Sequence, residues 1–239
     1  MSDAYRALAA PRKLLPPNRQ RILQLCRWTG EPNTELNDDQ VEILHEFSLS
    51  SGAAALVGVG IGKSLASFLF PNVAPVSRPL IIVRSKLVKN LWREHTKWNR
   101  HYFIPDFEVM TYEDLSNNEQ LGRLEVMAPG SIVLDEAHRM KIQTSSRWIK
   151  FVQFLVKHQA TRIVIMSGTV TTKNTNDYAH LFEAALRSGS PVPHCDTLAA
   201  DSWARTFGAI PDAQEYDYMN TRPLVQQYPN DEKTYTDQC

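Results

Sequence analysis

The stretch ALVGVGIGKSLASFLFP (residues 55–71) joins a short apolar run to a helical pattern through three glycines at alternate positions. Glycines permit a tight loop whose backbone N–H groups point inward, and a helix starting near Lys63 would direct the positive end of its dipole to the same place. The lysine can then reach the β- and γ-phosphates of a nucleotide, and the serine after it can bind Mg²⁺. The stretch predicts a phosphate loop of the Walker A type, although Val57 stands where the usual pattern has its first glycine.

The loop and the first helical turn are expected to contact the nucleotide. These contacts are assigned to Gly58, Gly60, Ile61, Gly62, Lys63, Ser64 and Leu65. Taken alone, the loop also has a plainer interpretation, as a glycine-rich turn between a strand and a helix with an incidental lysine. The choice between the two depends on whether the chain also supplies an acidic partner.

The segment SIVLDEAHRMK (residues 131–141) supplies that partner. Four strand-forming residues lead into Asp135 and Glu136, so both carboxylates are expected at the carboxyl edge of a sheet, beside the phosphate loop. Asp135 is predicted to bind Mg²⁺ together with Ser64, and Glu136 is predicted to deprotonate the attacking water. Acidic residues also favour helix starts, but that alternative does not explain the apolar strand before them. The two segments together predict that the chain binds ATP and Mg²⁺.

The rest of the chain predicts an α/β fold. From residue 36 to about residue 186, short β-rich runs alternate with helical patterns, which indicates a parallel sheet covered on both faces. Strands are expected at 53–57, 80–83, 107–111, 131–134 and 162–166, and helices at 39–49, 63–70, 86–98, 112–127 and 145–158. The expected organisation is an N-terminal extension (1–35), an ATP-binding lobe (36–189) and an acidic tail or linker (190–239).

Composition sets wider limits on the protein. With 239 residues, 43% of them hydrophobic, the chain can bury a core, and no apolar run is long enough to span a bilayer. The three cysteines are far apart, which argues against a disulfide framework or a zinc site and favours the cytoplasm. Residues 190–239 carry eight acidic and three basic residues, so the preceding 189 carry 18 acidic and 23 basic ones. This modest positive charge is compatible with a phosphate-bearing partner.

The two motifs and their surroundings resemble the superfamily two helicases and translocases, and in detail the Swi/Snf-type branch. DEAHRMKI is similar to the family's DEAHRLKN, and Ser167-Gly168-Thr169 is similar to its TGTP segment. LIIVRSKLVKNLWREHTKW (80–98) and VMTYEDL (109–115) resemble two further family segments, and the chain also resembles helicases carried by tailed bacteriophages. The resemblance covers about residues 36–210. It implies a RecA-like (P-loop NTPase) three-layer sandwich with a mostly parallel central sheet.

The resemblance also implies roles at the nucleotide. Gln40 stands where the family has an adenine-reading glutamine, but it lacks the usual RPYQ surroundings, so a plain helix residue is an equal alternative. His138 is expected to couple the ATP site to Ser167, Gly168 and Thr169 through a hydrogen bond, and an ordinary histidine at a helix start is the alternative. The family pattern is not matched at Val170, where proline is usual, or at 57–59, where DEM is usual.

Nucleic acid, with DNA as the expected form, is the implied partner. Ser85 and Lys86 follow one expected strand and match the family's DNA-backbone position, while Thr111 is a similar candidate after another strand. Such contacts would position the nucleic acid without reading its sequence. Trp92 and Trp148 could stack on bases, but at helical spacing such residues more often belong to the core.

Three functional hypotheses follow, with the motor lobe of a nucleic-acid-dependent ATPase of helicase or translocase type as the first. The second is an ATP-binding, DNA-docking module that does not turn over. A packaging ATPase, the third, leaves His138 and the Ser-Gly-Thr segment unexplained. The family's arginine-finger motif lies in a second RecA-like lobe, and nothing after Thr169 matches it. We therefore expect a second lobe, in cis or in trans, a truncated chain, and residence in the cytoplasm, that of the host if the protein is encoded by a phage.

Overall fold

The computed structural model describes residues 17–49, 52–56, 60–168, 178–187 and 190. The chain divides into two compact units. The larger unit comprises Pro17–Val170 and Ala184–Leu186 and contains the sheet. Helix α8 (Ala179–Leu186) crosses the division, so its first residues belong to the smaller unit.

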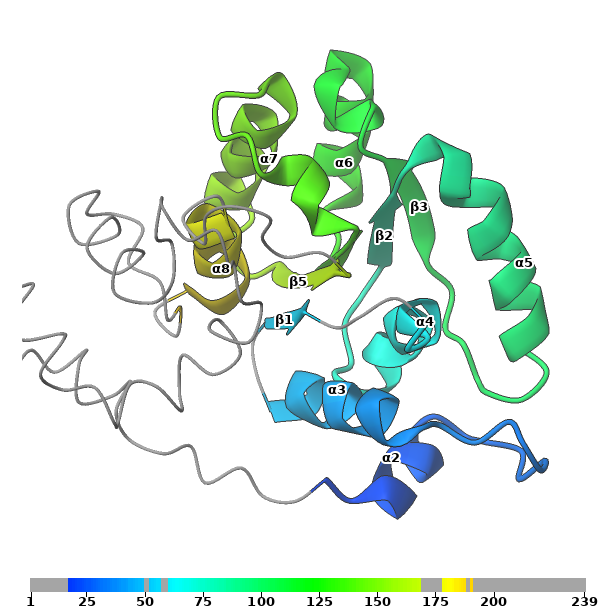
Figure 1. The fold of residues 1–239 in the computed structure, drawn as a ribbon. Coiled ribbons are helices and arrows are strands. Elements are labelled where there is room, and N and C mark those ends of the chain that lie inside the picture. The colour runs from blue at the N-terminus through cyan, green and yellow to red at the C-terminus, as the bar shows by residue number, and fades with distance from the viewer. Residues whose placement is uncertain (1–16, 50–51, 57–59, 169–177, 188–189, 191–239) are drawn as a thin grey trace, which may run out of the picture. The chain divides into compact units, whose positions relative to one another are not determined.

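Within the described residues, five strands form one parallel sheet in the order β1-β5-β4-β2-β3 (Figure 1). They are β1 (Ala53–Leu56), β2 (Pro79–Val83), β3 (Glu108–Thr111), β4 (Ser131–Asp135) and β5 (Arg162–Ser167). Each differs from its predicted bounds by at most one residue at either end. The three inner strands β2, β4 and β5 are buried on both faces, whereas the edge strands β1 and β3 are partly exposed. The predicted α/β fold with a parallel sheet is confirmed.

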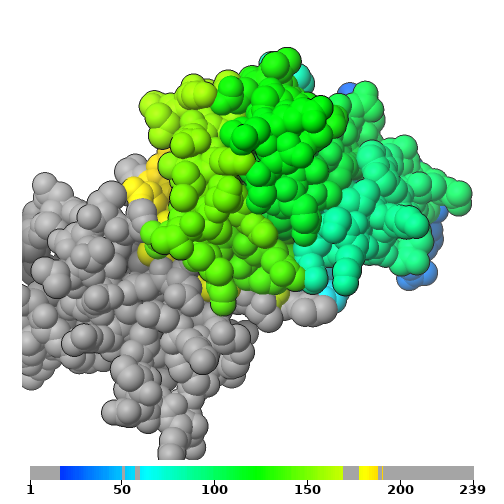
Figure 2. Space-filling view, turned by 90° about the horizontal axis from the view of Figure 1, so that it is seen from above, coloured from blue at the N-terminus to red at the C-terminus, as the bar shows by residue number. Residues whose placement is uncertain are grey.

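Helices connect the strands and cover both faces of the sheet. In the larger unit these are α2 (Arg19–Leu25), α3 (Asp38–Leu49), α4 (Lys63–Val73), α5 (Val88–Trp98), α6 (Asn118–Met127) and α7 (Ser146–Lys157). Short 3₁₀ turns lie at η1 (Ser85–Leu87), η2 (Asp114–Ser116) and η3 (Ala137–Met140). In Figure 1, α3 and α4 lie below the sheet, and α6 and α7 lie above it. Figure 2 shows α5 in teal and α6 and α7 in green to yellow-green at the surface of the molecule.

Two predicted helices differ from the observed ones by three residues or more, for local reasons. The helix predicted at 112–127 is broken, because the Asn117 side chain caps α6 by accepting a hydrogen bond from the Glu119 N–H at 2.8 Å. The residues before it form the separate turn η2. The helix predicted at 63–70 continues through Pro71 to Val73, and both of these residues are buried.

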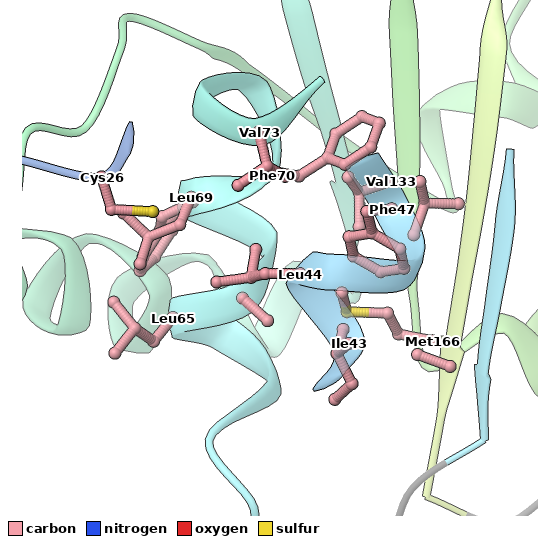
Figure 3. Packing of buried hydrophobic residues seen from close by; sticks show 14 of the residues in the cluster. Cys26, Ile43, Leu44, Phe47, Leu65, Leu69, Phe70, Val73, Val133 and Met166 are labelled. Atoms are coloured by element: carbon pink, nitrogen blue, oxygen red, sulfur yellow. The ribbon is translucent and has the colours of Figure 1, made fainter. Parts of the chain in front are cut away.

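One hydrophobic cluster joins α2, α3, α4 and α5 to a single face of the sheet. Val133 of β4 and Met166 of β5 face this cluster, and Figure 3 shows them beside side chains of α3 and α4. Phe47 and Phe70 pack edge to face there, with ring centroids 5.2 Å apart. Because side chains alternate along a strand, the residues directly before and after Val133 and Met166 face the opposite side of the sheet, where α6 and α7 lie.

The segment before residue 36 contributes to the same cluster. Ile22 of α2 and Cys26 just after it are fully buried in it, and the Arg19 guanidinium contacts Glu35, Asp38 and the Leu36 carbonyl. Burial raises the pKa of the Cys26 thiol to about 12, so this cysteine stays protonated and unreactive. The predicted boundary at residue 36 stays a proposal, as does the predicted tail at 190–239, which lies outside the described residues apart from Ser190. No helix among the described residues has the length and apolar character needed to cross a membrane.

Candidate active site

Three neighbouring strands bring the motif-bearing segments to one edge of the sheet. The strand β5 lies between β1, which precedes the phosphate loop, and β4, which ends at Asp135. Leu56 at the end of β1 is paired with Ser167 of β5, and Asp135 is paired with Met166. The carboxyl ends of the three strands therefore lie side by side, which is where parallel sheets bind their ligands.

The second half of the predicted phosphate loop has the backbone that its glycines predict. Gly60 and Gly62 have φ angles of 92° and 84°, in the left-handed region that other residues rarely adopt. Gly62 precedes α4 and provides no side-chain cap, so the first turn of α4 receives no cap from this position. A side chain at Gly62 would therefore be strained by the positive φ. Its Cβ atom would also lie 2.3 Å from Gln40 Nε2, so the Gln40 side chain would have to move. The expected contact residue Gly58 lies outside the described residues.

Asn37 and Gln40 hold the loop from the start of α3. The Asn37 N–H donates to Gln40 Oε1 at 3.0 Å, and the Gln40 N–H donates to Asn37 Oδ1 at 2.8 Å, a reciprocal arrangement similar to a capping box. Asn37 Nδ2 also donates to the Ile61 carbonyl, and Gln40 Nε2 donates to the Gly62 carbonyl, both at 3.3 Å. Both amide atoms of the buried Gln40 thus have backbone partners. Adenine recognition by Gln40 stays a prediction.

The last three residues assigned to the nucleotide lie in the first turn of α4, and they differ in burial. Lys63 and Ser64 are half-buried at the start of the helix. Leu65 is in the hydrophobic core, and its N–H donates to the Gly62 carbonyl at 3.0 Å. Lys63 lies close enough to Asp135 to lower the pKa of that carboxyl. The lysine and the acidic segment therefore face one site, while a nucleotide contact through Leu65 stays a prediction.

The Asp135 carboxyl is held in a site that disfavours its charge. Burial, and secondly the charge of Glu136, raise the pKa of Asp135 to about 6, although Lys63 and the Glu136 N–H act in the opposite direction. Glu136 itself has φ 57° and ψ 52°, an unusual backbone for a residue with a side chain. Five other described residues that are not glycine also have a positive φ, so this backbone does not by itself mark a functional site; they are Arg27, Asn33, Arg78, Ala128 and Arg187.

His138 lies beside Glu136 on the turn η3. Its Nδ1 is 3.1 Å from Glu136 Oε2, but the two atoms are not aligned for a hydrogen bond. Burial lowers the pKa of His138, and nearby cations, including Arg84 and Arg139, lower it further against the opposing effect of Glu136. The imidazole is therefore neutral at neutral pH. The turn packs on β5, which ends at Ser167, but Thr169 lies outside the described residues, and the coupling role of His138 stays a prediction.

The residues present fit a bound Mg²⁺. Ser64 offers a hydroxyl oxygen, Asp135 offers a carboxylate oxygen, and a cation would relieve the repulsion between Asp135 and Glu136. The described residues contain no group of three or more His, Cys, Asp or Glu side chains that could hold a metal by themselves. Mg²⁺ at nucleotide sites takes only one or two protein ligands, because phosphate and water oxygens supply the others.

The candidate nucleic-acid contacts lie at the ends of two adjacent strands. Ser85 and Lys86 are exposed on η1 after β2, and Thr111 ends β3, where it is paired with Val83. Thr111 Oγ1 accepts from the Asp114 N–H at 3.2 Å, which fixes its side chain. The next residue, Tyr112, is fully buried and its hydroxyl donates to the Asp135 carbonyl at 2.7 Å.

The two candidate stacking residues differ in exposure. Trp148 is only 8% exposed and belongs to the core, as its helical spacing predicted. Trp92 of α5 is 44% exposed and stacks on Phe107, with ring centroids 5.3 Å apart and ring planes inclined by 15°. One face of the Trp92 indole is therefore already occupied within the chain.

Comparison with solved structures identifies the fold. Over 91% of its length the chain superposes on the SWI2/SNF2 ATPase core of Sulfolobus solfataricus in complex with dsDNA, with a TM-score of 0.52. The chain has the RecA-like fold of an SWI2/SNF2 ATPase core. Sequence identity is 19%, and the chain covers 45% of the length of that protein. No protein-family model matches the chain, and no curated protein matches its sequence.

The resemblance noted in the sequence is thus confirmed for the fold. The match is to the same SWI2/SNF2 type that the DEAHRMKI segment suggested. The additional resemblance to phage helicases receives no support from these comparisons. At this level of identity the RecA-like match describes architecture, and what the chain does is argued from its own residues.

Asp135→Asn is expected to stabilise the nucleotide-free protein. Because the pKa of Asp135 is raised from 3.8 to about 6, its contribution to the free energy of unfolding is most favourable below pH 3.8 and is lost as pH rises through about 6. A shift of about two units corresponds to about 3 kcal/mol at neutral pH. Thermal unfolding at pH 7 should therefore show a melting temperature raised by several degrees, and the gain should vanish at pH 4. An equal gain at both pH values would contradict this assignment.

Proposed function

We propose that this chain is the ATP-binding lobe of a nucleic-acid-dependent ATPase motor of helicase or translocase type. The observation that carries the proposal is the meeting of the phosphate loop, the acidic pair and Ser167 at the ends of three neighbouring strands. The RecA-like fold shared with an SWI2/SNF2 ATPase core supports it. A parallel sheet alone would not require a lysine, two carboxylates and a histidine at one edge.

In this proposal each residue of the site has a separate task. The backbone of the loop and Lys63 bind the β- and γ-phosphates, and Asn37 and Gln40 hold the loop carbonyls in place. Ser64 and Asp135 hold Mg²⁺, which when bound neutralises charge on the phosphate oxygens. Glu136 accepts the proton of the attacking water.

Nucleic-acid binding is the second part of the proposal. The matched SWI2/SNF2 core is in complex with dsDNA, which supports DNA as the partner of this chain. Ser85, Lys86 and Thr111 are the proposed backbone contacts, because they share the carboxyl edge of β2 and β3. Contacts of this kind position a duplex and carry no sequence information.

A non-catalytic ATP-binding and DNA-docking module is the second candidate. Its support is that the sequence after Thr169 shows no arginine-finger motif. In the leading proposal a second RecA-like lobe, in cis or in trans, supplies that arginine. The two candidates differ in whether phosphate is released when the second lobe is present.

Lys63→Ala tests the nucleotide site. Because a hydrogen bond to a charged group is worth about 1.5–3 kcal/mol, affinity for a fluorescent ATP analogue should fall by about 10–100-fold. Lys157→Ala is the control, since Lys157 lies exposed on α7 and pairs with Glu125. A Lys63 variant that binds the analogue as tightly as the parent would refute the Walker A assignment.

A further inference from the structure

A row of exposed cations runs along α5 and its two ends. We call it the α5 stripe, and its members are Lys86, Lys89, Arg93, Lys97 and Arg100. They are separated by three, four, four and three residues, so on an ideal helix they fall within an arc of about 80°. All five are exposed. The opposite side of α5 carries Leu91, which is buried in the core.

The charge of the α5 stripe is not balanced by neighbouring acids. Among the described residues, none of its five members forms an ion pair, whereas Arg19, Arg123 and Lys157 elsewhere on the surface do. Glu94 is the only acid between the ends of the stripe, and its carboxylate accepts from Trp98 Nε1 at 3.2 Å. Arg93 donates to Asn90 Oδ1, and the Lys97 ammonium lies over the Trp98 ring, 4.5 Å from its centroid. Within the described fold the stripe therefore presents cations without an acidic partner.

The helix dipole does not explain this row. Cations are favourable in the last turn of a helix, which accounts for Lys97, but they are unfavourable at its N-terminus by about 0.3–1 kcal/mol each. Lys86 and Lys89 lie at the N-terminal end of α5, where the first turn contains no acidic residue. The stripe thus continues to the N-terminal end of α5, where the helix dipole disfavours cations. We infer that an anion outside the chain stabilises these cations.

The far end of the α5 stripe borders a cavity. A hollow of about 430 Å³ is lined by Arg93, Thr96, Lys97, Arg100 and His101. His101 Nδ1 lies 3.0 Å from a Glu31 carboxylate oxygen, which places one acid at its margin. Three cationic side chains and a hydroxyl thus converge on one concave surface, a donor set that suits a phosphate group.

The stripe begins where the candidate nucleic-acid contacts lie. Lys86 is one of those contacts, at the carboxyl edge of β2, and Arg100 lies fourteen residues further along the chain. At the rise of an α-helix the row is about 20 Å long. Figure 2 shows the α5 region, in teal, at the surface of the molecule. The row is therefore long enough to contact several successive phosphates of one strand, which lie about 3.4 Å apart along the duplex axis.

We propose that the α5 stripe binds the sugar-phosphate backbone of nucleic acid and extends the interface from Lys86 to the cavity at Arg100. The inference rests on the proposed function and deepens it, since it adds a second contact region on the same partner. Nucleic acid is favoured over other polyanions because the row is straight, evenly spaced and continuous with the candidate contacts at Lys86. The stripe contributes affinity and salt dependence, and it does not read base sequence.

The test compares two triple variants with the same change in charge. Arg93→Gln, Lys97→Gln and Arg100→Gln remove three cations of the α5 stripe but spare the proposed edge contacts. Arg123→Gln, Lys150→Gln and Lys157→Gln remove three cations from α6 and α7 as the matched control. Affinity for a fluorescein-labelled duplex is measured by anisotropy between about 50 and 200 mM salt. Binding of an ATP analogue and circular dichroism melts establish that each variant is folded.

The expected result is specific to the α5 variant. Its affinity for duplex DNA should fall by about 10–100-fold, and the slope of log K against log salt should decrease in magnitude by about 3, while the control keeps the parental slope.

Parental affinity and slope in the α5 variant would overturn the stripe proposal and leave the proposed function standing. A parent that binds no nucleic acid would refute the proposed partner itself. A parent that binds vesicles containing phosphatidylserine but not DNA would assign the stripe to a membrane surface instead. If the triple variant fails to fold, the double variant Lys89→Gln, Arg100→Gln decides between the same outcomes.

Discussion

Glu136→Gln is expected to stop ATP hydrolysis while MgATP affinity stays at the parental value, in a preparation that hydrolyses ATP. The amide has nearly the same size as the carboxylate but cannot accept the proton of the attacking water, and general-base catalysis contributes about 10²–10⁴-fold. Phosphate release under saturating MgATP measures the first effect, and titration with a fluorescent analogue measures the second. The Glu136 carboxylate is only partly exposed, and its Oε2 lies 3.1 Å from His138 Nδ1.

Glu119→Gln provides the matched control for this experiment. Glu119 is exposed in the first turn of α6, so its replacement removes the same charge far from the phosphate loop along the chain. Its turnover should equal that of the parent. Parental turnover in the Glu136 variant would mean that this residue only starts the turn η3 and that another group activates water.

The second large effect concerns the 239-residue chain by itself. We expect it to bind MgATP but to release phosphate very slowly, with little stimulation by DNA. In the proposed site, Lys63, the loop backbone and Mg²⁺ contact one side of the γ-phosphate, and no cation contacts the other side. An arginine finger supplied there by a partner raises the rate by about 10³–10⁵-fold. That factor corresponds to about 4–7 kcal/mol of transition-state stabilisation. No motif after Thr169 matches such a finger.

Steady-state phosphate release with no nucleic acid, with single-stranded DNA and with duplex DNA measures this expectation. A Lys63→Ala sample provides the background of each assay. DNA-stimulated turnover of several per second or more, a value typical of complete enzymes, would show that the chain is a working motor without a second lobe. Tight MgATP binding with no release, even when a second lobe is added, would favour the non-catalytic module.

Much of the fold could be predicted because its strands are unambiguous in the sequence. Runs such as LIIV and SIVL are short, apolar and rich in β-branched residues. Such runs are typical of parallel strands that are buried on both faces of a sheet. Helix ends were less predictable, because they depend on individual side chains. The break before α6 follows from the cap by Asn117, and the extension of α4 through Pro71 follows from burial that only the folded core provides.

The candidate site was predictable where its chemistry is local in sequence. Lys63, Asp135 and Glu136 follow directly from the two motifs. The support by Asn37 was missed, although its spacing of three residues from Gln40 is the signal of a capping box. Tyr112 could not be found in this way, because its bond to the Asp135 carbonyl joins two segments whose proximity depends on the order of strands in the sheet.

That single bond from Tyr112 has a mechanical consequence. It ties the residue after Thr111, at the candidate nucleic-acid edge, to the main chain of the acidic pair. Tyr112 is completely buried, so in the present packing no solvent is at hand to replace the carbonyl as its partner. Leaving such a group without a partner costs about 1–3 kcal/mol, which would change an equilibrium between two arrangements of the site by roughly 5–150-fold. Moving the backbone at Thr111 away from Asp135 would therefore cost about that much free energy. The candidate nucleic-acid edge and the candidate nucleotide site must move together or break this bond.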